Sequence, residues 1–232
     1  MKIDSFASIF AKAEQHHDGY EALLTKLPVL LSDAELLRLS DALYLERLTA
    51  CIFVSGFSKK VIQSKWPGFL EVFHDFDLEK LSELTDDEWD AMREDTRIIR
   101  NARKIQSVRD NVRMIRDVSA EHNGFGRFLV NWGAQDQVGL MKFLNKKGNQ
   151  IGDNTSQYFL RYVGVDGFVL SSDICAAAIE AGVEIASREK GRGQKPISQK
   201  DKHTLQQAFN YWHDETQMPY THLSKIMAFS QG

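Results

Sequence analysis

Residues 146–174 read KKGNQIGDNTSQYFLRYVGVDGFVLSSDI, and their layout predicts a tight turn between two helices. Gly148 and Gly152 bracket this turn, which we call the hairpin. Glycine allows backbone N–H groups to approach a phosphate closely, and the N-terminus of the following helix adds a partial positive charge. The stretch therefore predicts an anion-binding hairpin, with two flanking lysines as further phosphate partners, Lys146 and Lys147.

Apolar residues elsewhere in the chain recur at helical spacing. Between residues 23 and 54 they lie three or four positions apart, as they do on helices that pack against a core. Two capping boxes, Ser32-x-x-Glu35 and Thr85-x-x-Glu88, mark helix starts. No run combines strict apolar alternation with turn signals, so we predict an all-α fold of about ten helices.

The composition excludes several classes of protein. The chain has 232 residues, 43% hydrophobic and 26% charged, which is enough for one large core or two smaller ones. No stretch approaches the roughly 20 apolar residues of a membrane span, and the first residues lack the apolar core of a secretory signal. We therefore expect a cytoplasmic protein that binds no membrane. Cys51 and Cys175 lie too far apart in sequence for a CxxC zinc site, so neither a metal nor a cofactor is expected.

Charge is distributed unevenly along the chain. The net charge is −3, but residues 71–95 hold eleven acidic residues against two basic ones. Residues 97–116 reverse this balance, with seven basic residues against one acidic residue. Arg97, Arg100 and Lys104 would share one face of a helix. Such a stripe either contacts DNA phosphates or pairs with the acidic segment, and the sequence leaves both interpretations open.

The opening stretch resembles the helix-hairpin-helix superfamily of base-excision DNA glycosylases. In that superfamily a hairpin ending in (V/I)-G precedes a helix, and a catalytic aspartate follows at the start of a later helix. Ile151-Gly152 matches the hairpin, and Phe168-x-Leu170-x-x-Asp173 matches the approach to the aspartate. The resemblance implies that Asp173 is the catalytic carboxylate. The alternative is that Asp173 is only a helix N-cap, with the preceding serines as rivals for that role.

The same resemblance assigns DNA contacts at the hairpin. They are the residues Lys146, Lys147, Gly148, Gly152, Asn154 and Thr155. Superfamily members that also cleave the DNA backbone carry a lysine in the first turn after the hairpin, where this chain has Asp153 and Asn154. No Schiff-base amine is available at that place, so the resemblance implies a monofunctional enzyme that uses water as its nucleophile.

Residues 50–106 resemble a second, narrower family, 3-methyladenine DNA glycosylase I. The matching motifs are Ser55-Gly56-Phe57-Ser58, Phe73-His74-Asp75-Phe76-Asp77 and Ile98-Ile99-Arg100-Asn101-x-x-Lys104-Ile105-Gln106. In this family the last motif faces DNA. The resemblance therefore implies DNA contacts by Arg100, Asn101 and Lys104.

Two positions depart from that family's base pocket. The family has a glutamate where this chain has Cys51, and a tryptophan where it has Lys59. Its cysteine and histidine zinc ligands have no counterparts here, so no metal is implied. A flipped base is stacked between aromatic rings. The predicted base pocket accordingly combines the two departures with nearby rings: Cys51, Phe53, Phe57, Lys59 and Tyr158.

Together these observations predict a two-lobed helix-hairpin-helix glycosylase fold. Residues 38–163 would form a helical barrel lobe that ends in the hairpin, and residues 1–37 with 164–232 the second lobe. The predicted function is excision of alkylated, 3-methyladenine-like bases from double-stranded DNA in base excision repair. The alternative is a catalytically inactive DNA-binding or damage-recognition protein on the same scaffold, because two pocket residues are replaced. No obligatory protein partner is indicated.

Overall fold

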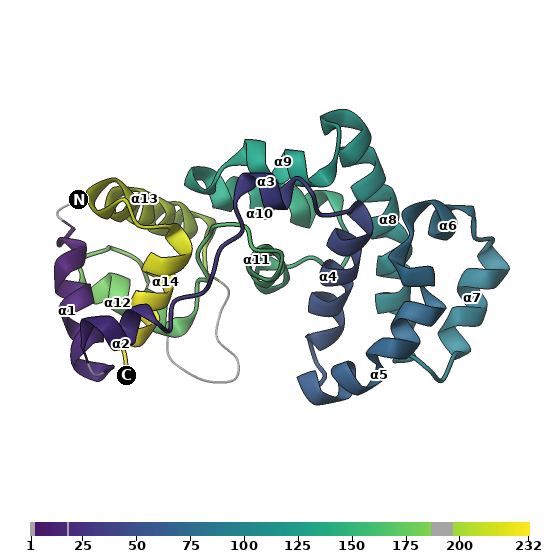
Figure 1. Ribbon diagram of the computed structural model, residues 1–232, viewed down its shortest axis with the longest axis horizontal. Helices are drawn as coiled ribbons and strands as arrows, with labels where there is room; N and C mark the ends of the chain where they lie inside the picture. The colour runs from purple at the N-terminus through teal and green to yellow at the C-terminus, as the bar shows by residue number, and fades with distance from the viewer. Residues whose placement is uncertain (1–2, 18, 187–196) are drawn as a thin grey trace. The chain divides into compact units, whose positions relative to one another are not determined.

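The computed structural model describes residues 3–17, 19–186 and 197–232 (Figure 1). Within these ranges the regular structure is entirely helical, with fourteen α-helices and two short 3-10 helices, so the all-α prediction is confirmed. The number of helices exceeds the expected ten or so because several are very short. Helices of four to six residues, such as α2 (Tyr20–Leu24), α3 (Asp33–Leu36) and α6 (Leu78–Glu83), are too short to show a helical spacing of apolar residues. No helix among the described residues is long and apolar enough to cross a membrane.

The chain divides into two compact units. Unit 1 comprises residues 1–30, 133–140 and 166–232, and unit 2 comprises residues 31–132 and 141–165. Compared with the predicted lobes, residues 31–37 and 164–165 belong to unit 2, and residues 133–140 belong to unit 1. Hydrogen bonds explain both differences. Leu31 N donates to Gly164 O over 3.3 Å within unit 2, and Val138 N donates to Gln206 Oε1 over 3.1 Å within unit 1.

Unit 2 is built around its longest helix. Its elements are α3 (Asp33–Leu36), α4 (Asp41–Val54), α5 (Lys59–Val72), η1 (His74–Phe76), α6 (Leu78–Glu83), α7 (Asp86–Glu94), α8 (Ala102–His122), α9 (Phe125–Trp132) and α11 (Asp153–Tyr162). Helices α4, α6, α7 and α9 pack against α8, as Figure 1 shows. Apolar side chains spaced three and four apart on α8, such as Ile105, Val108, Val112 and Ile115, are buried in this core. Both predicted capping boxes are confirmed at the starts of α3 and α7.

Unit 1 packs its helices around aromatic rings. Its elements are α1 (Phe6–His16), α2 (Tyr20–Leu24), η2 (Ala134–Asp136), α12 (Ser172–Glu180), α13 (Gln199–Thr216) and α14 (Tyr220–Phe229). The ring of Phe168 stacks on Phe209 with centroids 4.4 Å apart, and Trp212 is fully buried beside them. The remaining helix, α10 (Gln137–Lys147), begins in unit 1 and continues into unit 2, where it leads to the hairpin.

A non-helical segment precedes α12, and we call residues 166–171 the approach segment. Three side chains form hydrogen bonds with its backbone N–H and C=O groups, as a neighbouring strand would in a β-sheet. Gln137 donates to Phe168 O and accepts from Phe168 N, both over 2.7 Å. Thr221 Oγ1 accepts from the N–H of Gly167, and Ser224 Oγ accepts from that of Val169. Because buried backbone groups need partners, these contacts fix the segment that leads to Asp173.

Candidate functional site

The hairpin joins α10 to α11 through residues 148–152. Gly152 is the N-cap of α11, and no side chain of the described residues caps this helix start. A Cβ added at Gly152 would meet no described atom within 4 Å. The start of α11 thus has no side-chain capping bond among the described residues, which favours phosphate binding at this helix N-terminus.

Gly148 has a packing role that the sequence did not suggest. A Cβ added there would lie 2.9 Å from Asn111 Oδ1 and collide with the side chain of Ile151. The glycine thus permits close packing of the hairpin on α8, and its predicted contact with DNA stays a prediction. The left-handed turn residue is Gln150, with φ of 60°, and no sequence signal identified it.

The other predicted hairpin residues lie on the surface of unit 2 or close to it. Lys146, Lys147 and Asn154 are exposed, and Thr155 is half-buried in the first turn of α11. Two exposed ammonium groups beside an uncapped helix N-terminus favour binding of a phosphate chain. Their contact with DNA stays a prediction.

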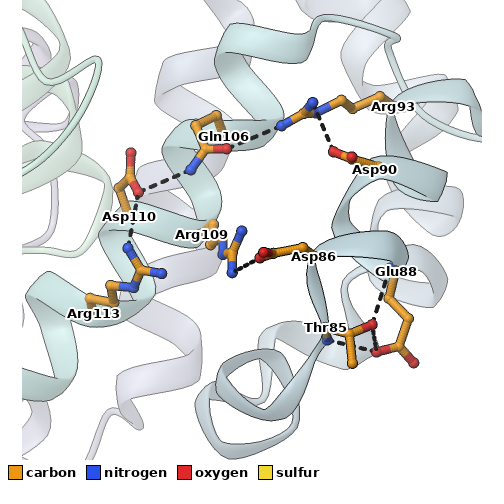
Figure 2. A network of polar contacts seen from close by, with 9 residues as sticks. All are labelled: Thr85, Asp86, Glu88, Asp90, Arg93, Gln106, Arg109, Asp110 and Arg113. Carbon is orange, nitrogen blue, oxygen red and sulfur yellow. Dashed lines mark hydrogen bonds and ion pairs between the residues drawn. The ribbon is translucent and has the colours of Figure 1, made fainter.

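The predicted stripe is not on one helix, because Arg97 and Arg100 precede α8, whereas Lys104 lies in it. Two arginines of this basic segment pair with acidic side chains. Arg97 forms ion pairs with Asp95 at 2.6 Å and Glu71 at 3.1 Å. Arg109 pairs with Asp86 at 2.5 Å, as Figure 2 shows. For Arg97 and Arg109, the structure therefore favours pairing with the acidic segment over free phosphate-binding groups.

Arg100, Asn101 and Lys104 occupy three different environments. Arg100 is exposed just before α8, and its predicted contact with DNA stays untested. Asn101 is the N-cap of α8, because its side chain accepts from Lys104 N over 3.1 Å. Lys104 Nζ donates to the carbonyl groups of Ile52, Phe53 and Ser55 at the end of α4, and burial lowers its pKa. Asn101 and Lys104 thus have structural roles, whether or not they also contact DNA.

Three of the predicted pocket residues gather beside α11. The Tyr162 side chain is the main cause of a raised pKa of Lys59, with smaller electrostatic contributions from Tyr158 and Cys51. The Lys59 ammonium lies 5.8 Å from the centroid of the Tyr162 ring, which is within the range of a cation–π interaction. We call these four residues the base-pocket cluster. Tyr162 was not among the predicted pocket residues, although it lies one helical turn after Tyr158 and shares its helix face.

Exposed aromatic surface is available at this cluster. The side chains of Tyr158 and Tyr162 are 45% and 47% exposed, and their ring centroids lie 6.3 Å apart. Phe57 is also exposed, with the Lys104 ammonium 5.0 Å from its ring centroid. Phe53, by contrast, is fully buried and packs edge-on against Phe69 with centroids 4.7 Å apart. Phe57 and the two tyrosines therefore present rings on which a base could stack, whereas Phe53 belongs to the core.

Cys51 places a neutral group where the resembled family has a carboxylate. The residue is 7% exposed, and burial raises the pKa of its thiol to about 12. The thiol is therefore uncharged at neutral pH. Lys59, close by, is exposed and protonated, so the cluster presents a positive rather than a negative charge.

Asp173 lies in unit 1, in the first turn of α12. The N-cap of this helix is Ser171, whose hydroxyl accepts from Ile174 N over 3.3 Å. Asp173 is thus not the N-cap, and the alternative role considered for it belongs to the serine. The residue is half-buried, at the end of α12 where the helix carries its partial positive charge.

No group of three or more His, Cys, Asp or Glu side chains in the described ranges is arranged to hold a metal ion. The candidate groups are therefore the open end of α11, the base-pocket cluster with Phe57, and the carboxylate of Asp173. Groups of these kinds bind phosphate, stack bases and stabilise positive charge in proteins that act on DNA.

Comparison with known proteins finds a family match over the part of the chain that contains these candidate groups. A model of the methyladenine glycosylase family matches residues 37–179. Among solved structures, a 3-methyladenine DNA glycosylase I is 20% identical, over 62% of this chain and 87% of that chain, with a TM-score of 0.49. The Staphylococcus aureus 3-methyladenine DNA glycosylase I is 19% identical, over 54% and 77% of the two chains, also with a TM-score of 0.49. No curated protein matches.

Proposed function

The chain belongs to the methyladenine glycosylase family, and on this premise we propose that it is a monofunctional DNA N-glycosylase that excises alkylated, 3-methyladenine-like bases. The supporting observation is that the family match spans all the candidate groups. Residues 37–179 include the hairpin, the base-pocket cluster and Asp173. The family implies damaged DNA as the substrate. Action in the cytoplasm, within base excision repair, is part of this proposal.

In the proposed reaction each candidate group has one task. The N-terminus of α11 and the adjacent lysines bind the DNA backbone, and Tyr158, Tyr162 and Phe57 stack the flipped base. Water bonds to C1′ of the sugar as the bond from C1′ to the base nitrogen breaks, and the base leaves with that electron pair. The Asp173 carboxylate stabilises the positive charge on the sugar and accepts a proton from the water. An alkylated purine with a positive charge leaves without prior protonation.

The decisive measurement is single-turnover release of free base from duplex DNA that contains 3-methyladenine, 7-methylguanine or hypoxanthine. Release of one of these bases by the wild-type protein is the expected result. Release without strand cleavage would further support the monofunctional assignment, because the first turn of α11 carries no lysine.

A second candidate function is damage recognition without catalysis. The neutral thiol of Cys51 favours it, because this position holds a carboxylate in the resembled family. DNA binding that weakens steeply with salt, together with no release of any base, would support this alternative. A protein without salt-dependent DNA binding would contradict both candidates.

Removing an exposed ring tests the stacking role. We expect Tyr158→Ala to weaken binding of DNA that contains the damaged base by about 5- to 150-fold, because stacking on one aromatic ring contributes about 1–3 kcal/mol. Fluorescence anisotropy with lesion-containing duplex measures this change. Tyr211→Ala is the matched control, since Tyr211 is 46% exposed and Tyr158 is 45% exposed. Equal affinities of the two variants would contradict a stacking role for Tyr158.

A further inference from the structure

A buried amide on α8 holds the tip of the hairpin. Asn111 is 1% exposed, and both halves of its side-chain amide contact the same residue. Its Nδ2 donates to Asn149 O over 3.0 Å, and its Oδ1 accepts from Asn149 N over 2.8 Å. This pairing requires a donor and an acceptor on one short planar group, which an asparagine supplies.

A second contact fixes the side chain of the same hairpin residue. Asn149 Nδ2 donates to Asp110 Oδ2 over 2.6 Å. The other oxygen of Asp110 accepts from Gln106 Nε2 over 3.1 Å and lies 3.8 Å from Arg113. Figure 2 shows Asp110 between these two partners. Gln106 in turn accepts from Arg93 of α7 over 3.2 Å, so the carboxylate is held from both sides.

The hairpin needs such support because its own conformation is costly. Gln150 adopts a left-handed φ of 60°, which a residue with a Cβ rarely adopts unless its surroundings impose it. Gly148 also packs closely on Asn111, since a Cβ at this position would lie 2.9 Å from Asn111 Oδ1. Asn111 and Asp110 therefore secure the loop immediately before Gly152, where α11 presents its N–H groups.

We propose that Asn111 and Asp110 are positioning residues that hold the hairpin in the conformation in which the N-terminus of α11 binds DNA phosphate. This inference rests on the proposed function, since it assumes that the hairpin contacts DNA. Neither residue needs to touch DNA. Their contribution is to keep the N–H groups directed at the phosphate, so that without them this phosphate contact is lost and the loop must also be ordered on binding.

The positioning role predicts a change in DNA affinity opposite to the one that charge alone would cause. Removing a negative charge near a DNA-binding surface should tighten binding, because repulsion of phosphates decreases. If Asp110 positions the hairpin, Asp110→Ala should instead weaken binding of the full-length protein to undamaged duplex DNA by about 3- to 10-fold. Asp110→Asn keeps an acceptor for Asn149 and loses the charge, so it should bind at least as tightly as the wild type. Asp117→Ala makes the same charge change at an exposed position on α8 and is the matched control.

Asn111→Leu tests the backbone contact directly. We expect its affinity for duplex DNA to fall by at least about 10-fold, and the slope of log Kd against log salt to decrease by about 0.9, the value for one lost phosphate contact. The single-turnover rate constant at saturating DNA should remain within about twofold of the wild type, because a positioning role in binding leaves the chemical step intact. A merely destabilised protein would show a smaller active fraction with an unchanged salt slope.

The outcomes separate this inference from the proposed function. If wild-type protein binds DNA, and Asp110→Ala binds as tightly as Asp117→Ala, the positioning role is wrong while the proposed function stands. An unchanged salt slope in Asn111→Leu leads to the same conclusion. If wild-type protein shows no salt-dependent binding, both fail. The Asp110 variants keep the test decisive even if Asn111→Leu does not fold, because the Asp110 side chain is 31% exposed.

Discussion

Asp173→Asn is expected to lower the single-turnover rate constant for base release by about 100-fold or more, because a positioned acid–base group typically contributes 10²- to 10⁴-fold. The substitution keeps the size of the side chain and removes its negative charge. The amide can neither accept the proton of the attacking water nor stabilise positive charge on the sugar as a carboxylate does. DNA affinity should stay within about twofold, since the phosphate contacts are assigned to the hairpin.

The structure supplies a control for this substitution. Asp214 lies on the exposed surface of α13, in the same unit as Asp173. Asp214→Asn makes the same chemical change and should leave base release unaltered. Ser171 remains as the N-cap of α12 in both variants, so loss of the helix start does not explain a lower rate. Full base release by Asp173→Asn would show that another group supplies the negative charge.

The sequence predicted the helices well where local chemistry determines them. Both capping boxes lie at helix starts, and the glycine-bracketed turn lies between α10 and α11. Local signals of this kind act over a few residues and can be recognised in the chain. Local signals do not indicate the unit boundaries, because these depend on long-range contacts such as that between Val138 and Gln206.

The roles of individual charged residues were least predictable. Lys104 matched a motif that faces DNA in the resembled family, yet its ammonium donates to carbonyl groups at the end of α4. Sequence spacing shows which helix face a lysine occupies, but not which carbonyl groups a distant helix brings to it. Sequence spacing likewise does not reveal the partner of Asn111, since Asn149 lies 38 residues away in the chain.

The Gln137 side chain carries the largest expected effect on stability. Gln137→Leu keeps a similar volume but removes both hydrogen bonds to Phe168, leaving a buried N–H and a buried C=O without that partner. Each unsatisfied buried group costs about 1–3 kcal/mol, so we expect the free energy of unfolding to fall by about 2–6 kcal/mol. Urea unfolding followed by circular dichroism measures this loss. Gln207→Leu makes the same change on the exposed face of α13 and should cost less than about 0.5 kcal/mol.

The same substitution connects stability with the proposed chemistry. Phe168 belongs to the approach segment, which leads directly into the helix that carries Asp173. If this segment shifts, the carboxylate moves with it, and a displacement of about 1 Å is enough to lower a catalytic rate by about 100-fold. We therefore expect the folded fraction of Gln137→Leu to release base more slowly than wild-type protein, with DNA affinity nearly unchanged. A rate equal to that of Gln207→Leu, after correction for the folded fraction, would mean that Thr221 and Ser224 suffice to hold the segment. The stability loss and the rate loss are separate measurements, so each of these two roles of Gln137 can fail without the other.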